Sequence, residues 1–267
     1  MRRLIPDGYR LLEVEDCAST NDACLEAAVG GDPGRLWIRA ERQHAGRGSR
    51  GRSWQSGSGN LFASLLLVDP APMAALANLT FVAALGVHDA IETLAVAHGI
   101  HADIKLKWPN DVLVSGRKIS GILLENHDIS SGDSRRRAIV IGIGINCAGH
   151  PSDVPTKATD MTVEGMATSA RDLMPHLATG LDSWLQRWNR GAGFADIRRH
   201  WLARAAGLDQ RIVVKLGNRQ VQGVFEDIDA QGLLCLRLDD GSVETLSSAE
   251  VFFGTSGHGS PGGTGTG

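Results

Sequence analysis

Residues 46–54 read GRGSRGRSW, which places three glycines and three arginines directly before a tryptophan. The glycines allow positive φ angles and leave backbone N–H groups accessible, so such a loop can curl around an anion. The guanidinium groups of Arg47, Arg50 and Arg52 add forked donors that match carboxylate and phosphate oxygens. This composition predicts a loop that stays flexible until a ligand binds. A solvated basic loop without a ligand is the alternative interpretation.

The loop fits neither of the common nucleotide-binding glycine motifs. Its text matches G-x-G-x-x-G, but the following RSWQSGSGN cannot open a helix, and no GK[ST] closes a P-loop. Its interpretation therefore depends on charge and on backbone freedom.

A second polar group lies in KWPNDVLVSGRKISGILLEN, residues 107–126. Asn110 and Asp111 follow a proline, which is typical of a turn, but an amide beside a carboxylate is also a common arrangement near Mg²⁺ and phosphate. Lys118 lies in a predicted strand, where a lysine usually faces solvent. Gly121 indicates the close approach of a ligand or another backbone. Further on, Gly142 and Gly144 alternate with isoleucines and serve either packing or the space of a flat ligand.

Composition limits the classes of function. The chain has 267 residues, 42% of them apolar, which is enough for a sizeable core. Its net charge of −3 makes the arginine cluster a local feature and argues against nucleic acid as a partner. Four cysteines without metal-ligand spacing predict reduced thiols in a cytoplasmic protein. The sequence has no signal peptide and no apolar run of about 20 residues, so no membrane partner is expected.

Hydrophobic periodicity predicts the elements that position these residues. We expect strands at 9–14, 35–42 and 60–68, helices at 19–28 and 72–99, and three or four strands between 104 and 146. Two amphipathic helices follow, in RDLMPHLATGLDSWLQRW and FADIRRHWLARAA. After Gly207, four or five short strands with tight turns predict a small barrel. The fold class is therefore α+β, with a mixed or antiparallel sheet backed by helices.

The motifs become specific in combination, because STN at 19–21, GRGSRGRSW at 46–54, KWPNDV…GRKISGIL at 107–123 and GIGIN at 142–146 occur in this order. Together they resemble biotin protein ligases, which activate biotin as biotinyl-AMP and attach it to a carrier lysine. The resemblance is strong over 9–150 and looser to 253, since the family also has an SH3-like C-terminal barrel. It implies a catalytic domain over 1–207 and the barrel over 208–254. The composition of the tail over 255–267, which is rich in glycine, serine and threonine, predicts disorder.

The resemblance also implies the ligands and their residues. ATP and Mg²⁺ are the expected cofactors, biotin the substrate, and a biotin carboxyl carrier domain the protein partner. The implied biotin-binding residues are Ser19, Thr20, Asn21, Gln43, Arg47, Gly48, Ser49, Lys118, Gly142 and Gly144. The implied ATP-binding residues are Arg50, Arg52, Trp54, Asn110 and Asn146, with the metal at Asp111. Lys118, Arg47 and Arg50 are the expected catalytic residues, because cations offset the repulsion between biotin's carboxylate and the α-phosphate.

Two departures from the family pattern carry hypotheses. Ser49 stands where the family often has arginine, which predicts a loop that clamps the adenylate less firmly. About eight residues precede the first strand. That leaves no room for the helix-turn-helix of family members that repress transcription, so we expect no DNA binding.

Two other classes of function stay open at this point. A lipoate ligase or octanoyl transferase would use a related architecture, and a non-catalytic module would use the basic loop for binding alone. The arginine- and glycine-rich loop and the KWPND segment argue against the first, and release of pyrophosphate on addition of biotin and ATP distinguishes a ligase from the second, which releases none. A homodimer through a sheet edge is also compatible with the fold.

Overall fold

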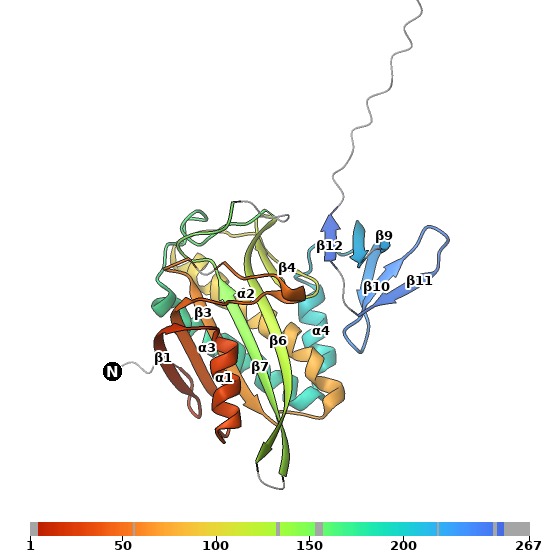
Figure 1. The fold of residues 1–267 in the computed structure, drawn as a ribbon. Coiled ribbons are helices and arrows are strands. Elements are labelled where there is room, and N and C mark those ends of the chain that lie inside the picture. The colour runs from red at the N-terminus through yellow and green to blue at the C-terminus, as the bar shows by residue number, and fades with distance from the viewer. Residues whose placement is uncertain are drawn as a thin grey trace, which may run out of the picture.

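The computed structural model describes residues 5–55, 57–131, 134–152, 157–217, 219–247 and 250–253. The expected disordered tail, 255–267, lies outside the described residues. These residues form two β-sheets and four α-helices, and the smaller sheet (blue in Figure 1) lies at one side of the larger body.

The larger sheet has seven strands in the order β1-β2-β3-β7-β6-β5-β4. Their bounds are β1 Arg10–Cys17, β2 Leu36–Gln43, β3 Leu61–Val68, β4 Ile104–Lys107, β5 Asp111–Val114, β6 Arg117–Ser131 and β7 Ser134–Ile145. The β1–β2 pair is parallel and all other pairs are antiparallel, so the sheet is mixed as predicted. β7 lies between β3 and β6, which puts Gly142 and Gly144 in the middle of the sheet.

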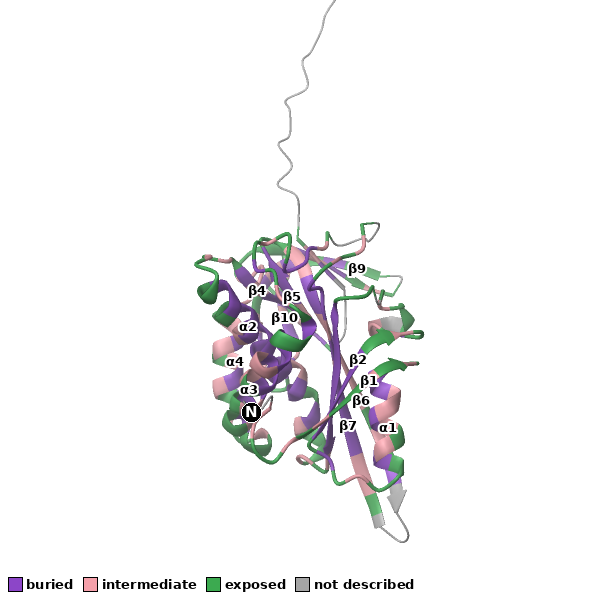
Figure 2. Cartoon of the chain, turned by 90° about the vertical axis from the view of Figure 1, so that its left-hand side faces the viewer, coloured by how far each residue is buried: buried purple, intermediate pink, exposed green. Residues whose placement is uncertain are grey.

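Helices cover both faces of this sheet (Figure 1). α1, Thr20–Val29, packs on one face over a small apolar cluster that includes Cys24, Ile38 and Val140. α2 Leu79–Ala97, α3 Ala170–Trp188 and α4 Phe194–Leu202 lie on the other face over the main core. Figure 2 shows that buried residues line the inner sides of these helices and the central strands.

The helix predicted at 72–99 is wrong at its start. Residues Met73–Asn78 form a 3₁₀ helix (η2), and the α-helix begins only at Leu79. The combined segment, Met73–Ala97, is long and apolar enough to cross a membrane, but 72% of its most apolar 18-residue stretch is buried inside the protein. A helix that is apolar on all sides is typical of a protein core, so the segment is weak evidence for a membrane span.

The C-terminal sheet has five antiparallel strands in the order β11-β10-β9-β8-β12. They are β8 Arg211–Leu216, β9 Arg219–Ile228, β10 Leu234–Arg237, β11 Val243–Leu246 and β12 Glu250–Phe253. Its buried residues, among them Phe225 and Ile228, join the core cluster that also contains α2 and α4. The α+β class with an added C-terminal sheet is confirmed, and the division into domains at 207 and 254 stays a prediction.

Candidate active site

The start of α1 places three of the expected biotin-binding residues. Ser19 is the N-cap of α1, and its hydroxyl accepts a hydrogen bond from the Asn21 N–H at 3.2 Å. Thr20 donates its backbone N–H to Gln43 Oε1 at 2.8 Å. The parallel register of β1 and β2 pairs Gln43 with Cys17, which explains why these distant residues meet. An N-cap serine fixes the first helical turn, so the polar groups at 19–21 are held rigidly.

The amide of Asn21 lies against the central strands of the larger sheet. Its Oδ1 lies 2.6 Å from the hydroxyl of Ser64 on β3, and its Nδ2 donates to Glu125 Oε2 on β6 at 2.6 Å. A Cβ at Gly142 would overlap Asn21 Oδ1, so a larger residue at this position of β7 would displace the Asn21 amide. Sequence reasoning missed Ser64 and Glu125, although Ser64 is the only polar residue in the apolar strand LFASLLLV.

The glycine- and arginine-rich loop folds back on itself. Arg47 and Ser53 form a bridge, Gly48 N donates to Arg52 O at 2.7 Å, and Trp54 N donates to Gly46 O at 2.8 Å. A 3₁₀ turn (η1, Ser49–Gly51) forms the tip. These backbone hydrogen bonds close a short hairpin, and the flexibility of the loop before a ligand binds stays a prediction.

Arg47 points from this hairpin to the two carboxylates beside Asn21. Its guanidinium donates to Asp22 at 2.8 Å and to Glu125 Oε2 at 3.0 Å. The hydrogen bond that Arg47 donates to Asp22 raises the pKa of Arg47 above its ordinary value. Arg52 lies exposed beyond the tip, and the side chain of Arg50 lies outside the described part of the chain.

Trp54 lines the cavity and lies close to two of its glycines. Carbons of its ring would be 2.5 Å from a Cβ at Gly144 and 2.8 Å from one at Gly121, so both glycines make room for the indole. The ammonium of Lys118 lies 5.5 Å from the ring centroid, at cation–π distance. The remaining cavity has a volume of about 40 Å³. Ligand pockets usually measure about 300–1,000 Å³, so the indole has to move for a ligand the size of biotin to enter.

The KWPND segment reaches the same cavity through Asn110, which lines it, and through the contact of Asp111 with Lys118. Lys118 Nζ lies 2.5 Å from Asp111 Oδ1, and Asn110 Nδ2 donates to Ile122 O at 2.7 Å. Asn146 is 3% exposed, and its amide donates to Thr159 O at 2.9 Å. The amide of Asn146 therefore stabilises the loop at Thr159 through this hydrogen bond.

Most of the predicted site residues line one cavity. Its walls contain Ser19, Thr20, Asn21, Gln43, Arg47, Gly48, Ser49, Trp54, Asn110, Lys118, Gly142 and Gly144, together with Gly121, Ile122, Leu123 and Ile143. Of the other predicted residues whose side chains are described, Arg52, Asp111 and Asn146 do not line it. Asp111 touches the site through its ion pair with Lys118.

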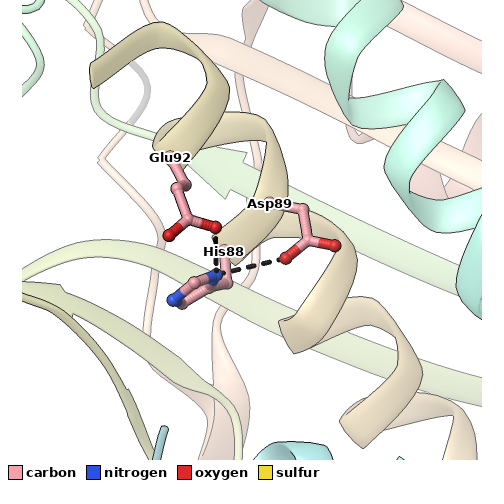
Figure 3. Close-up of side chains that lie close together, drawn as sticks. All are labelled: His88, Asp89 and Glu92. Carbon is pink, nitrogen blue, oxygen red and sulfur yellow. Dashed lines mark hydrogen bonds and ion pairs between the residues drawn. The ribbon is translucent and has the colours of Figure 1, made fainter. Parts of the chain in front are cut away.

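A separate cluster on α2 combines His88, Asp89 and Glu92 (Figure 3), and their potential metal-ligand atoms lie within 4.8 Å of one another. Both carboxylates face the same ring atom, His88 Nδ1, at 3.2 and 3.8 Å. The second oxygen of Asp89 accepts the indole N–H of Trp184 on α3 at 2.7 Å. The hydrogen bond between Asp89 and Trp184 ties α2 to α3, which is a structural role.

Comparisons with known proteins agree with this geometry. The Biotin/lipoate A/B protein ligase family matches residues 19–146, and the Biotin protein ligase C terminal domain matches 207–254. A biotin–[acetyl-CoA-carboxylase] ligase of Paracoccus denitrificans is 40% identical over 242 residues, which is 88% of this chain and 97% of that protein. A ligase of the same name from Mycobacterium tuberculosis is 33% identical over 251 residues, 91% of this chain and 89% of that protein.

The fold has solved counterparts as well. The biotin protein ligase from Aquifex aeolicus in complex with biotin and ATP superposes with a TM-score of 0.74 at 25% identity, covering 91% of this chain and 97% of that one. The identity to the curated ligases extends over nearly their whole length and includes both sheets. With the motif residues gathered around one cavity, this chain belongs to the biotin protein ligase family.

Proposed function

We propose that this chain activates biotin with ATP to biotinyl-AMP and then transfers biotin to a lysine of a biotin carboxyl carrier domain. The observation that carries the proposal is the meeting of Lys118, the arginine loop and the polar groups of α1 at one cavity. Its walls combine neutral hydroxyls and amides with the cations Arg47 and Lys118. This combination suits a ligand with a neutral polar head and an acidic tail.

The head of biotin is assigned to the α1 end. Its ureido ring needs both hydrogen-bond donors and acceptors, and Ser19, Thr20, Asn21 and Gln43 supply both kinds. These side chains are already fixed by hydrogen bonds to one another and to Ser64, so little entropy is lost on binding. Gly142 and Gly144 leave space above β7 for the second ring.

The adenylation step follows from charge. One carboxylate oxygen of biotin attacks the α-phosphorus of ATP, the bond from that phosphorus to the bridging oxygen breaks, and pyrophosphate leaves with the electron pair. Lys118, Arg47 and Arg50 stabilise the negative charge that develops on the α-phosphoryl oxygens. In the free protein Asp111 and Glu125 hold Lys118 and Arg47 near these positions.

The nucleotide is assigned to Arg50, Arg52, Trp54, Asn110 and Asn146. For Mg²⁺, the carboxylate of Asp111 and the amide oxygen of Asn110 are hard oxygen donors at the cavity edge, which fits an ion completed by phosphates and water. The ion would neutralise phosphate charge. Asn146 acts indirectly in this assignment, because its amide supports the neighbouring backbone at Thr159.

Transfer completes the reaction. The carrier's lysine amine attacks the carbonyl carbon of biotinyl-AMP, AMP leaves, and the amine gives up a proton to solvent. The hairpin at 46–54 shields the mixed anhydride from water until the carrier arrives. We further propose a cytoplasmic location, since the four cysteines are free thiols, and a homodimer formed through the edge strand β1.

The decisive experiment follows pyrophosphate release from ATP with biotin, lipoate or octanoate as the acid. We expect release with biotin alone, and then a streptavidin signal on a purified carrier domain that requires ATP and Mg²⁺. Release with lipoate or octanoate would favour the related acyl transferases. No release with any acid would leave a binding module as the better interpretation.

A further inference from the structure

The segment that leads into the KWPND motif is held by the connection between the two sheets. Leu106, in strand β4, donates its N–H to Arg204 O at 2.8 Å and accepts the N–H of Ala206 at 2.8 Å. These bonds form a parallel bridge to Ala205, between α4 and β8. The chain that leads into the C-terminal sheet therefore lies beside the edge strand β4 and is hydrogen-bonded to it.

The next two side chains contact the C-terminal sheet itself. The indole of Trp108 is 3% exposed, and its N–H donates to Gly232 O in the β9–β10 turn at 3.3 Å. The ammonium of Lys107 lies 5.8 and 5.7 Å from the ring centroids of Phe252 and Phe253 in β12. A buried indole N–H that lost its acceptor would keep its desolvation cost, so the Gly232 carbonyl specifies where Trp108 sits.

The β9–β10 turn has little freedom to move away. Gly232 has a φ of +87°, and a Cβ at this position would lie 2.8 Å from Phe81 on α2. The turn thus packs against the core helix while it accepts the bond from Trp108. Packing against the main core therefore fixes the turn, and the hydrogen bond from Trp108 to Gly232 O fixes the indole relative to the turn.

Asn110 and Asp111 lie two and three residues after Trp108 in the sequence. Asn110 is fixed on its other side by a pair of hydrogen bonds with Ile122, and Asp111 contacts Lys118 at 2.5 Å. A displacement of about 1 Å in a reacting group can reduce a rate about a hundredfold. The segment with Asn110 and Asp111, which are assigned to the nucleotide and its metal, is therefore held on one side by β6 and on the other by the C-terminal sheet.

We propose that Trp108 is a positioning residue through which the C-terminal sheet sets the ATP-binding geometry of Asn110 and Asp111. The proposal rests on the proposed function for the identity of the nucleotide. On this proposal the C-terminal sheet affects the binding of ATP and does not affect the binding of biotin at the start of α1.

The test compares two phenylalanine substitutions. Trp108→Phe keeps an aromatic ring but removes the N–H to Gly232. Trp201→Phe is the matched control, because Trp201 is 1% exposed, packs edge-on against Phe81 at 5.5 Å, and has an indole N–H without a partner in the described residues. Both variants lose the same atoms from the core. We expect Trp108→Phe to weaken ATP binding, measured by calorimetry, and to raise the KM for ATP, each by about tenfold.

Biotin affinity, measured without ATP, should stay within twofold of wild type in both variants, and Trp201→Phe should leave ATP binding unchanged. Gly232→Ala, which forces the turn away from Phe81, should reproduce the ATP defect. Equal ATP affinity in Trp108→Phe and Trp201→Phe overturns the proposal, as does a parallel loss of biotin and ATP affinity. Because ATP binding is measured directly, its outcome is separate from failure of biotin-dependent pyrophosphate release, which would refute the proposed function.

Discussion

Gly142→Ala is the sharpest test of how the biotin end of the site is built. The new Cβ would overlap Asn21 Oδ1 and lie 2.9 Å from Asn21 Cγ. β7 cannot retreat, because Gly142 is paired with Ser64 on β3 and with Leu123 on β6. The Asn21 side chain must therefore rotate away from its place.

The cost can be worked out from the bonds that Asn21 makes. A neutral hydrogen bond such as that to Ser64 contributes about 0.5–1.5 kcal/mol, and one to a carboxylate such as Glu125 contributes about 1.5–3 kcal/mol. Glu125 is partly exposed, which favours the lower values, so the free energy of unfolding should fall by about 2–3 kcal/mol. For a protein of this size, that lowers Tm by about 4–12 °C.

Biotin binding should suffer separately. Loss of one or two hydrogen bonds from the Asn21 amide to the ureido ring weakens binding by about tenfold to a hundredfold. Isothermal calorimetry with biotin and no ATP measures this, at a temperature where circular dichroism shows the variant folded. Gly149→Ala is the control, since a Cβ there meets no atom within 4 Å. A Gly142→Ala protein with wild-type Tm and biotin affinity would refute the proposed role of Asn21.

Three further predictions test the catalytic group, the loop and the thiols. Lys118→Ala should slow biotin-dependent pyrophosphate release by about 100-fold to 1,000-fold, because a cation beside the developing charge is lost; a rate within tenfold of wild type would contradict this. Ser49→Arg should reduce biotinylation of bystander lysines measured on a streptavidin blot, and equal labelling would exclude a looser clamp. Burial raises the pKa of both Cys24 and Cys147 to about 12, so a thiol reagent at pH 8 should modify the partly exposed Cys17 well before these two. Rapid modification of all three thiols in the folded protein would contradict that burial.

Local pattern in the sequence was enough to predict the elements and the motif residues. Alternating and continuous apolar runs indicate the strands around Ile38, Leu65 and Ile143, because side-chain periodicity is a local property. The glycine- and arginine-rich loop, the KWPND segment and the alternating glycines of β7 are likewise continuous stretches. Their combination resembles one family closely enough to indicate the function.

Only the tertiary structure decided which groups meet. Ser64 and Glu125 hold Asn21 from strands that lie 43 and 104 residues further along the chain, and no local pattern encodes such contacts. The same holds for Trp54 between Gly121 and Gly144, and for Trp108 at the turn containing Gly232. The physical reason is that hydrogen bonding and close packing depend on distances in space, which sheet order and strand register set. The sequence determined the residue types at these positions, and the folded sheet determined their partners.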